Sequence, residues 1–415
     1  FRRVLFRSNE MSIAENHGGL YQNLKELRDT EGRSSCNFFR SLGLDYLYVG
    51  EGNDIPSLVA AFAKVKDTSR PTVVHIHTQK GKGYAPAEAD REEFHWEMPF
   101  DLETGKPKVD CSGMEDYHSL TGKFLLEKMK EDHTVVAISS GTPTVIGFTP
   151  ERRKQAGRQF VDVGIAEEHA VALASGIAAG GGRPVYGVYS TFVQRCYDQL
   201  SQDLCINGNP AVITVFMGTV AGMNDVTHLG FFDIPLISNI PNMVYLAPTC
   251  SEEYFAMLEW AVRQTEYPVA IRVPGVAVVH RKEEFDTDYS ELNRYKMTAR
   301  GETVAILALG AFYDLGQALK NKLREESGVE ATLINPRYIT GLDEPMLEEL
   351  KVGHRIVVTL EDGVLDGGFG EKIARYYGNS EMRVLNYGLR KEFADRYNLD
   401  ELMKANRLTD KQMAE

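Results

Sequence analysis

The sequence predicts an α/β protein with parallel sheets, and two observations support this prediction. Runs rich in β-branched and aromatic residues alternate with segments of helical periodicity, which is typical of βαβ units. Polar stretches divide the 415 residues into three blocks, and this length suggests roughly two to four domains. We therefore expect two doubly wound parallel-sheet domains in tandem, at residues 1–112 and 113–285, and a smaller C-terminal α/β domain at residues 286–415.

The first block contains one clear βαβ unit. Residues 44–50 and 71–78 are predicted strands, and residues 55–67 between them have helical periodicity. Strand, helix and strand in succession imply two parallel strands. Residues 88–113 are polar, contain prolines and glycines, and are predicted to be a linker.

The second and third blocks repeat this alternation. The predicted strands are residues 133–140, 183–191, 211–218, 242–248, 303–310, 329–337 and 355–362. The predicted helices are residues 117–132, 167–181, 251–265, 311–327 and 367–378. Residues 286–300 are polar and have no clear pattern. Because open parallel sheets bind ligands at the carboxyl ends of their strands, the segments that follow the strands are the candidates for a site.

The composition excludes several classes of protein. A formal net charge of −13 disfavours a broad basic surface for nucleic acid or anionic membrane. The five cysteines include no C-x-x-C pair, so we expect neither a disulfide framework nor a zinc site, and a cytoplasmic location fits. We find neither an apolar run long enough for a transmembrane helix nor a signal peptide.

Two carboxylates open a helix at the end of a strand-like run. Glu167 and Glu168, followed by His169, come one residue after the run at 161–165. Acidic residues in the first turn of a helix interact favourably with the helix dipole, so this feature by itself also fits a solvated helix start.

Three further segments follow predicted strands. Tyr189, Phe192 and Arg195 form one group, His228 lies in a glycine-containing loop, and Lys80 lies among glycines. Glycine permits close approach of the backbone to a ligand and lysine offers a charge for phosphate. Taken singly, the aromatic residues also fit a core, the histidine a packing position, and the lysine a solvated loop.

Together these segments resemble the 1-deoxy-D-xylulose-5-phosphate synthase family, which is related to transketolase. The resemblance covers nearly all of Asn9–Glu415 and is most specific over Val161–Asp203, with further strong matches at Asn9–Asn16 and Gln79–Glu88. It implies thiamine-diphosphate-binding domains of the transketolase type, with thiamine diphosphate held through Mg²⁺, and a homodimer. It also implies a transferase that condenses pyruvate with glyceraldehyde 3-phosphate and releases CO₂, in isoprenoid and thiamine precursor synthesis.

The resemblance also implies roles for single residues. Glu167 matches the glutamate that contacts the aminopyrimidine ring, and Phe192 matches the aromatic residue stacked on that ring. The other matching positions are Lys80 near the diphosphate, Asn9 and the Met11 carbonyl as magnesium ligands, Tyr189, Arg195 and His228 in the substrate pocket, and His95 as a pocket histidine from the first domain. His95 and His228 are therefore catalytic candidates beside Glu167.

The chain departs from the family at its amino-terminal end. The resemblance starts at Asn9 and the family's preceding Gly-Asp-Gly motif is absent. We therefore expect residues 1–8 to be foreign, the first domain to be truncated, and this chain to bind the cofactor weakly.

The chain also departs from the family at the acceptor site. Met217 and Gly275 stand where the family has arginines, and Asn224 stands where it has an acid. Each lost charge-assisted phosphate contact costs on the order of 1.5–3 kcal/mol, unless Arg272 or Arg195 substitutes. There are two alternatives. One is a transketolase-like enzyme with a different acceptor aldehyde, and the other is a non-catalytic subunit that keeps only the fold.

Overall fold

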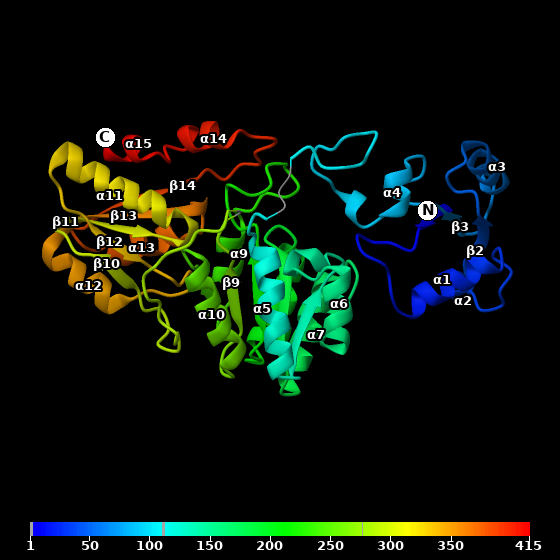
Figure 1. The fold of residues 1–415 in the computed structure, drawn as a ribbon, viewed down its shortest axis with the longest axis horizontal. Coiled ribbons are helices and arrows are strands. Elements are labelled where there is room, and N and C mark those ends of the chain that lie inside the picture. Colours follow the sequence, from blue (N-terminus) through cyan, green and yellow to red (C-terminus); the bar gives the residue numbers. More distant parts are fainter. Residues whose placement is uncertain (1–2, 110–112, 276) are drawn as a thin grey trace. The chain divides into compact units, whose positions relative to one another are not determined.

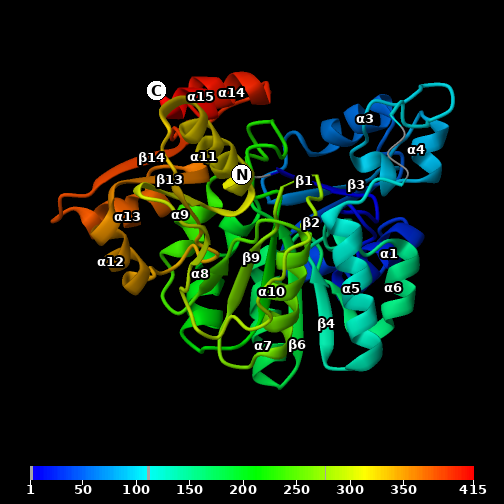
Figure 2. The same cartoon turned by 60° about the vertical axis from the view of Figure 1, so that its left-hand side comes forward.

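The computed structural model describes residues 3–109, 113–275 and 277–415, which form two compact units. The first unit contains residues 1–114 with 163–165, and the second contains residues 115–162 and 166–415. Cys111 and the predicted domain end at residue 112 lie outside the described residues. The predicted α/β class is confirmed, because helices flank parallel strands in both units (Figures 1 and 2).

The first unit is a three-stranded parallel sheet with the order β1-β3-β2. The predicted βαβ unit is confirmed, since β2 (Asp45–Val49), α3 (Ile55–Val65) and β3 (Thr72–His77) follow in that order and the two strands pair in parallel. The Asp54 carboxylate accepts a hydrogen bond from the Ser57 amide at 2.8 Å and so fixes the start of α3. The remaining elements are α1 (Gly19–Asp29), α2 (Phe38–Ser41), α4 (Ala85–Ala89) and η1 (Glu93–His95).

The segment predicted to be foreign forms strand β1, Arg3–Ser8. It pairs in parallel and in register with β3 along its whole length. The hydroxyl of Ser8 lies 2.6 Å from Nε2 of the buried His75, and Phe6 packs edge-on against Phe39. Whatever its origin, this segment is a strand of the sheet.

The second unit begins with a six-stranded sheet in which every neighbouring pair is parallel. The strands lie in the order β5-β4-β6-β7-β9-β8, which is doubly wound. Their bounds are β4 Val135–Ser139, β5 Phe160–Asp162, β6 Arg183–Tyr189, β7 Val212–Phe216, β8 Val244–Leu246 and β9 Val269–Arg272. The flanking helices are α5 (Tyr117–Glu131), α6 (Pro150–Ala156), α7 (Glu167–Ala179), α9 (Asp233–Ser238) and α10 (Ser251–Arg263), with short turns at η2 (Pro143–Ile146), η3 (Gly157–Gln159), η4 (Val193–Cys196), α8 (Tyr197–Gln199) and η5 (Leu200–Cys205).

A second sheet of the same unit has five strands in the order β10-β12-β11-β13-β14. Their bounds are β10 Lys296–Ala299, β11 Thr303–Ala308, β12 Thr332–Asn335, β13 His354–Val364 and β14 Arg383–Leu389. Only β10 is antiparallel to its neighbour, so the sheet is mixed. Helix α11 (Tyr313–Ser327) covers one face, and α12 (Glu344–Gly353) and α13 (Phe369–Tyr377) cover the other (Figure 1). The rest is η6 (Gly310–Phe312), α14 (Leu399–Ala405) and α15 (Asp410–Ala414).

The two sheets of the second unit are joined through buried polar contacts. Glu253 of α10 is 1% exposed and accepts a hydrogen bond from the Asn335 amide of β12 at 2.9 Å. Leu246 at the end of β8 forms a backbone bridge with Tyr338, which follows β12. These contacts place the second sheet beside the carboxyl end of the first.

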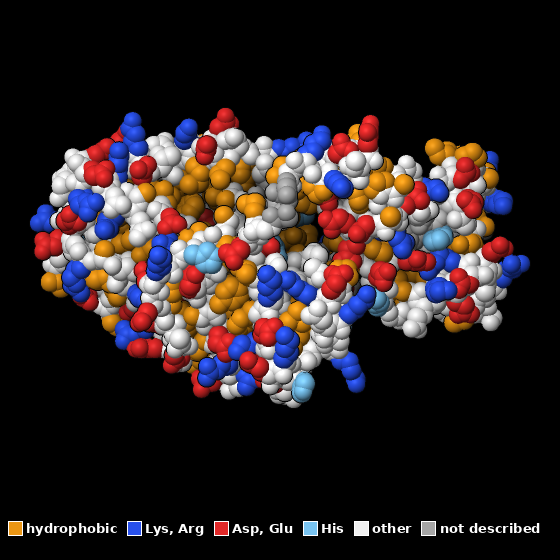
Figure 3. Space-filling view, viewed as in Figure 1, with side chains coloured by type: hydrophobic (Ala, Val, Ile, Leu, Met, Phe, Trp, Pro, Cys, Tyr) orange, Lys and Arg blue, Asp and Glu red, His pale blue; other side chains and the backbone are white. Residues whose placement is uncertain are grey.

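The surface carries charges of both signs. On the face shown in Figure 3, lysine and arginine side chains are interspersed with acidic ones. The formal net charge of the chain is −13. Across the described part of the chain, no helix combines the length and the apolar character needed to cross a membrane.

Candidate active site

The six-stranded sheet has a topological switch point between β4 and β6. From β4 the chain crosses to β5 on one side, and from there to β6 on the other side. Open parallel sheets bind ligands outside the carboxyl ends of the strands at such a point. Glu167 begins α7, which leads from β5 to β6, and Tyr189 ends β6. Both predicted residues therefore lie at the end of the sheet where a ligand is expected.

Glu167 is a buried acid with an accessible partner. Its side chain is 3% exposed, and its Oε2 accepts a hydrogen bond from Nη1 of Arg195 at 3.1 Å. The Arg195 side chain, which comes from η4, is 57% exposed. Burying a carboxylate is costly unless it is paired. The arginine supplies this pairing and can also contact a ligand at the surface.

The thiol next to Arg195 is not a nucleophile. Cys196 is completely buried, and burial, with a smaller contribution from the Glu167 and Glu168 carboxylates, raises the pKa of its thiol to about 12. A thiol with such a pKa stays protonated at neutral pH. Cys196 is therefore unsuited to act as a nucleophile in this site.

Three predicted aromatic residues form one cluster in the second unit. The ring of Phe192 lies edge-on to Tyr189 at 5.6 Å between centroids and 5.4 Å from the ring of His228. Burial raises the pKa of the Tyr189 hydroxyl, so this group stays a neutral donor. The structure thus brings together residues that are 39 positions apart in the sequence.

His228 is oriented by an acid that the sequence prediction did not include. Its Nδ1 lies 3.0 Å from Oδ1 of Asp225, which also accepts hydrogen bonds from the amide and hydroxyl of Thr227. The bonds from Thr227, and then that from His228, lower the pKa of Asp225 to about 2, so this carboxyl group is ionised at neutral pH. An ionised acceptor favours the tautomer with a proton on Nδ1, in which Nε2 is free to accept a hydrogen bond. The i, i+3 spacing of an acid and a histidine in one loop was the available signal.

The predicted residues of the first unit form a second group. Lys80 donates to the carbonyl oxygen of Ser12 at 3.2 Å, which places its ammonium beside the segment that carries Asn9 and Met11. Burial lowers the pKa of Lys80, and burial followed by the charge of Lys80 lowers the pKa of His95. Lys80 therefore lies beside the segment that carries Asn9 and Met11, and its charge acts on His95.

The magnesium site is only partly provided by the described residues. Asn9 is buried and its Oδ1 accepts a hydrogen bond from the Met11 amide at 3.2 Å, which leaves a lone pair of this oxygen for a cation. Among the residues that the structure describes, no three His, Cys, Asp or Glu side chains converge on one point. Mg²⁺ prefers six oxygen ligands and often binds through phosphates and water, so a site built on Asn9 and the Met11 carbonyl oxygen would need such oxygens as its other ligands.

Arg272 is not placed as the sequence predicted. Its side chain is 3% exposed, and it donates to Asp233 and Asp362 and to the carbonyl oxygen of Gly230. These contacts and those to the Asp362 carbonyl oxygen engage its Nε and both terminal nitrogens. A guanidinium engaged in this way has no free donor directed at a ligand in this structure, so its burial argues against the substrate-binding role predicted for Arg272, which stays a prediction.

The three positions that depart from the family have their own backbone roles. Met217 has a left-handed φ of 56°, and its carbonyl oxygen accepts from the Thr219 amide and the Ser190 hydroxyl. Gly275 also has a positive φ, 58°. Asn224 donates to the carbonyl oxygen of Tyr397 at 3.0 Å. None of the three offers a positive charge to an acceptor phosphate.

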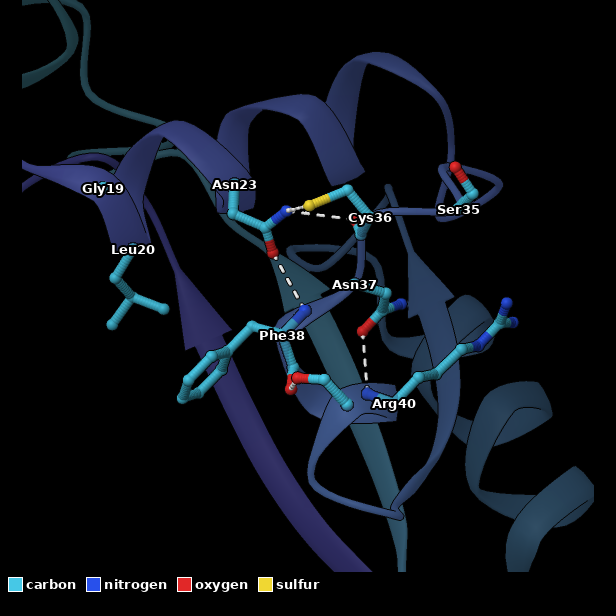
Figure 4. Close-up of a pocket in the computed structure, with 9 residues that line it drawn as sticks. Gly19, Leu20, Asn23, Ser35, Cys36, Asn37, Phe38 and Arg40 are labelled. Carbon is cyan, nitrogen blue, oxygen red and sulfur yellow. Dashed lines mark hydrogen bonds between the residues drawn. The ribbon is translucent and has the colours of Figure 1, made fainter.

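An open pocket of about 560 Å³ lies elsewhere in the first unit (Figure 4). Its wall includes Asn23, which donates to the carbonyl oxygen and the sulfur of Cys36, and Asn37, whose side chain accepts from the Arg40 amide. None of the predicted site residues lines this pocket. We therefore assign it no part in the candidate site.

Two family models match the second unit. The model described as "Transketolase, pyrimidine binding domain" matches residues 115–278, and "Transketolase, C-terminal domain" matches residues 294–413. The predicted boundary after residue 285 falls between these ranges. With Glu167 and Tyr189 at the switch point and His228 packed against Phe192, the matches define the class as a thiamine-diphosphate-dependent enzyme of the transketolase type.

Relatives narrow this class to one family. The 1-deoxy-D-xylulose-5-phosphate synthase of Clostridium acetobutylicum is 34% identical over 447 residues, covering 97% of this chain and 70% of the relative. The enzyme of the same name from Clostridium botulinum strain Alaska E43 is 32% identical over 430 residues, covering 92% of this chain and 67% of the relative. The chain belongs to the 1-deoxy-D-xylulose-5-phosphate synthase family.

Solved structures support the fold. A chain described as "Split gene transketolase, inactive beta4 tetramer" superposes with a TM-score of 0.60 at 21% identity, covering 73% of this chain and 96% of its own. A transketolase from Pichia stipitis has a TM-score of 0.57 at 14% identity, covering 99% of this chain and 70% of its own. At these identities the likeness concerns the fold alone.

Proposed function

We propose that the protein condenses pyruvate with glyceraldehyde 3-phosphate, forming 1-deoxy-D-xylulose 5-phosphate with release of CO₂. The family membership supports this reaction. The observation that carries it is the buried Glu167 carboxyl group, which lies at the switch point next to the exposed Arg195. The product belongs to isoprenoid and thiamine precursor synthesis.

The residues of the second unit fit the thiamine end of the cofactor. When bound, thiamine diphosphate supplies a nucleophilic carbon and an electron sink for the decarboxylation. Glu167 would hold or accept a proton at a nitrogen of the aminopyrimidine ring, because the site keeps its carboxyl group out of water. Phe192 would stack on that ring, and Tyr189 and His228 would face the substrate. Arg195 would bind a substrate anion. Its hydrogen bond to Glu167 would then be replaced by one to the substrate.

The residues of the first unit fit the diphosphate end. Asn9 and the Met11 carbonyl oxygen would contribute two ligands to Mg²⁺, and Lys80 would place its charge near the phosphates. His95 would add a donor to the substrate pocket. We also propose that the protein acts as a homodimer, as the resemblance implies.

The role of Glu167 is tested by Glu167→Gln in the full-length protein. The amide keeps the shape of the side chain but cannot exchange a proton, so we expect the rate of product formation to fall about 10²–10⁴-fold. The measurement is release of CO₂ from pyruvate in the presence of glyceraldehyde 3-phosphate. The matched control is Glu168→Gln, because Glu168 is the exposed neighbour on the same helix turn. Full activity of Glu167→Gln would refute the proposed mechanism.

A second candidate is a transketolase-like enzyme with an unphosphorylated acceptor. Met217 and Gly275 carry no charge, and the buried Arg272 is engaged with Asp233 and Asp362. This leaves Arg195 as the exposed arginine among the predicted pocket residues.

The two candidates differ in their acceptor. Pyruvate consumption by the full-length protein should be measured with glyceraldehyde 3-phosphate and with unphosphorylated aldehydes of similar length. If Arg195 alone binds the phosphate, we expect a Michaelis constant for glyceraldehyde 3-phosphate that rises about tenfold or more in Arg195→Met. Strict dependence on the phosphorylated aldehyde would eliminate the second candidate.

A further inference from the structure

The loop that carries His228 is built into the core of the C-terminal domain. This loop, residues 217–232, connects β7 to α9 and is here called the His228 loop. Its apolar side chains Val220, Leu229 and Phe231 are each at most 3% exposed and belong to a hydrophobic cluster whose other buried members all come from residues 304–413 of the C-terminal domain. Both ends of the loop are therefore fixed by a domain that contributes no residue to the predicted site.

Two hydrogen bonds to backbone carbonyl oxygens also hold this end of the loop, one from the C-terminal domain and one from the Arg272 side chain of β9. The Val364 amide of β13 donates to the carbonyl oxygen of Phe231 at 2.9 Å. Arg272 donates to the carbonyl oxygen of Gly230 at 3.2 Å. Leu229 lies between His228 and these bonded residues and is itself buried. The backbone on the C-terminal side of the histidine therefore has little conformational freedom.

The tip of the loop is exposed and is held by one short segment. Asn224 and Val226 are exposed, yet three hydrogen bonds join this tip to residues 395–397, which precede α14. The Val226 amide donates to Oδ1 of Asp395 at 3.1 Å, and the Arg396 amide donates to the carbonyl oxygen of Asn224 at 2.6 Å. The Asn224 side chain donates to the carbonyl oxygen of Tyr397.

The tyrosine of this segment reaches the base of the loop. The Tyr397 hydroxyl donates to the carbonyl oxygen of Val220 at 2.7 Å and lies 3.4 Å from that of Met223. Partial burial of the side chain raises its pKa to about 12, which keeps the hydroxyl protonated and able to donate. The segment therefore holds the loop at its tip and at residues on the N-terminal side of the tip.

The chemistry of position 224 fits this contact. The partner of the Asn224 side chain is a carbonyl oxygen, which accepts and cannot donate, so an amide satisfies it and a carboxylate would repel it. The neighbouring Asp225 supplies the carboxylate that orients His228. Asn224 thus binds the C-terminal domain, and Asp225 orients the histidine.

We propose that the segment Asp395–Tyr397 is a positioning element that holds the Asp225–His228 pair in place for the reaction. The proposal rests on the proposed function of this site. The segment touches no substrate itself. It acts through the backbone of Val226 and Val220, which fixes the direction in which the imidazole points.

The test compares two substitutions of Asp395 in the full-length protein. Asp395→Ala removes the acceptor for the Val226 amide, whereas Asp395→Asn keeps an oxygen in the same place. For Asp395→Ala we expect faster amide hydrogen exchange at residues 224–228 and a fall in kcat of about three- to tenfold, the factor that one hydrogen bond is worth. We expect Asp395→Asn to resemble the wild type in both measurements, and the midpoint of thermal unfolding to be unchanged in both variants.

A second pair of variants addresses the tyrosine. Tyr397→Phe removes the bond to the Val220 carbonyl oxygen, and its matched control is Tyr376→Phe, because the Tyr376 hydroxyl donates to Glu348 on the surface of the same domain. Only Tyr397→Phe should raise the exchange of the loop and lower kcat.

The results separate this proposal from the function on which it rests. Unchanged exchange in Asp395→Ala, or faster exchange without any change in kcat, would overturn the positioning role. If the proposed function is wrong, the results are different. The wild-type protein then forms no product, while Asp395→Ala and Asp395→Asn still differ in amide exchange.

Discussion

The His280 imidazole bridges two acidic side chains. Its Nδ1 lies 2.6 Å from Glu252 on α10, and its Nε2 lies 2.8 Å from Glu115, just before α5. The bonds to Glu252 and Glu115 raise the pKa of the imidazole above its usual 6.5. Both ring nitrogens can donate only when the ring is protonated, so the full bridge exists only in the charged form.

This raised pKa predicts a dependence of stability on pH. The stabilising contribution is fully present below pH 6.5, the unfolded pKa, and is lost as the pH rises through the raised folded value. We expect His280→Asn to lower the unfolding temperature at pH 6 and to have a smaller effect at pH 9. Thermal unfolding at both pH values measures this, with His133→Asn, at an exposed histidine, as the control. An equal effect at the two pH values would contradict it.

Among the elements, the His228 loop has a backbone that leaves little space at its two ends. It starts at Met217, whose φ of 56° is unusual for a residue with a side chain. Gly230 near its other end packs on the same residue, since a Cβ at Gly230 would lie 1.8 Å from the Met217 carbonyl oxygen. The two ends of the loop can meet only because position 230 has no side chain.

We therefore expect Gly230→Ala to open the loop. The clash is with backbone, which cannot rotate away, so the substitution should cost about 1–3 kcal/mol of stability, as overpacking does, and should lower activity through His228. The matched control is Gly353→Ala at the end of α12, where a Cβ would meet nothing within 4 Å, and where we expect a change within about 0.5 kcal/mol. Chemical denaturation of both variants measures the difference. Equal stability of the two would show that the loop can relax.

At the scale of the whole molecule, one buried ion-pair network joins the two domains of the second unit. Arg272 ends β9 of the pyrimidine-binding domain. It pairs with Asp233 of α9 in the same domain and with Asp362 of β13 in the C-terminal domain. All three side chains are at most 3% exposed. Removing one partner of such a network leaves the other charges buried and unpaired.

Arg272→Met should therefore destabilise the protein strongly, by about 3–5 kcal/mol. A surface pair provides the contrast, because Arg300 and Glu349 are 71% and 51% exposed, and we expect Arg300→Met to cost at most about 1 kcal/mol. Denaturant unfolding followed by circular dichroism measures both. A loss of phosphate affinity in Arg272→Met without loss of stability would favour the substrate-binding role that the structure argues against.

Much of the fold follows from the sequence alone. The strands around residues 45–49, 135–139 and 303–308 were predicted because each lies in a run rich in β-branched, aromatic or other apolar residues. Strand β10 was not, because it is a short edge strand in a polar stretch, and only its pairing with β12 makes it a strand. Helix α12 and strand β14 were also missed.

The candidate site divides in the same way. Glu167, Tyr189 and Phe192 could be found because each lies next to a strand end, which is a local feature of the sequence. Asp225 was missed, although its spacing to His228 is local.

The sequence by itself determined the alternation of strands and helices and the residues at the strand ends, because periodicity and turn signals depend on near neighbours. The tertiary structure alone decided that Arg272 is buried between two acids and that Asp395 holds Val226. The partners in these contacts are between 39 and 169 positions apart. No local pattern records such pairs, since burial and pairing arise only when distant segments pack together.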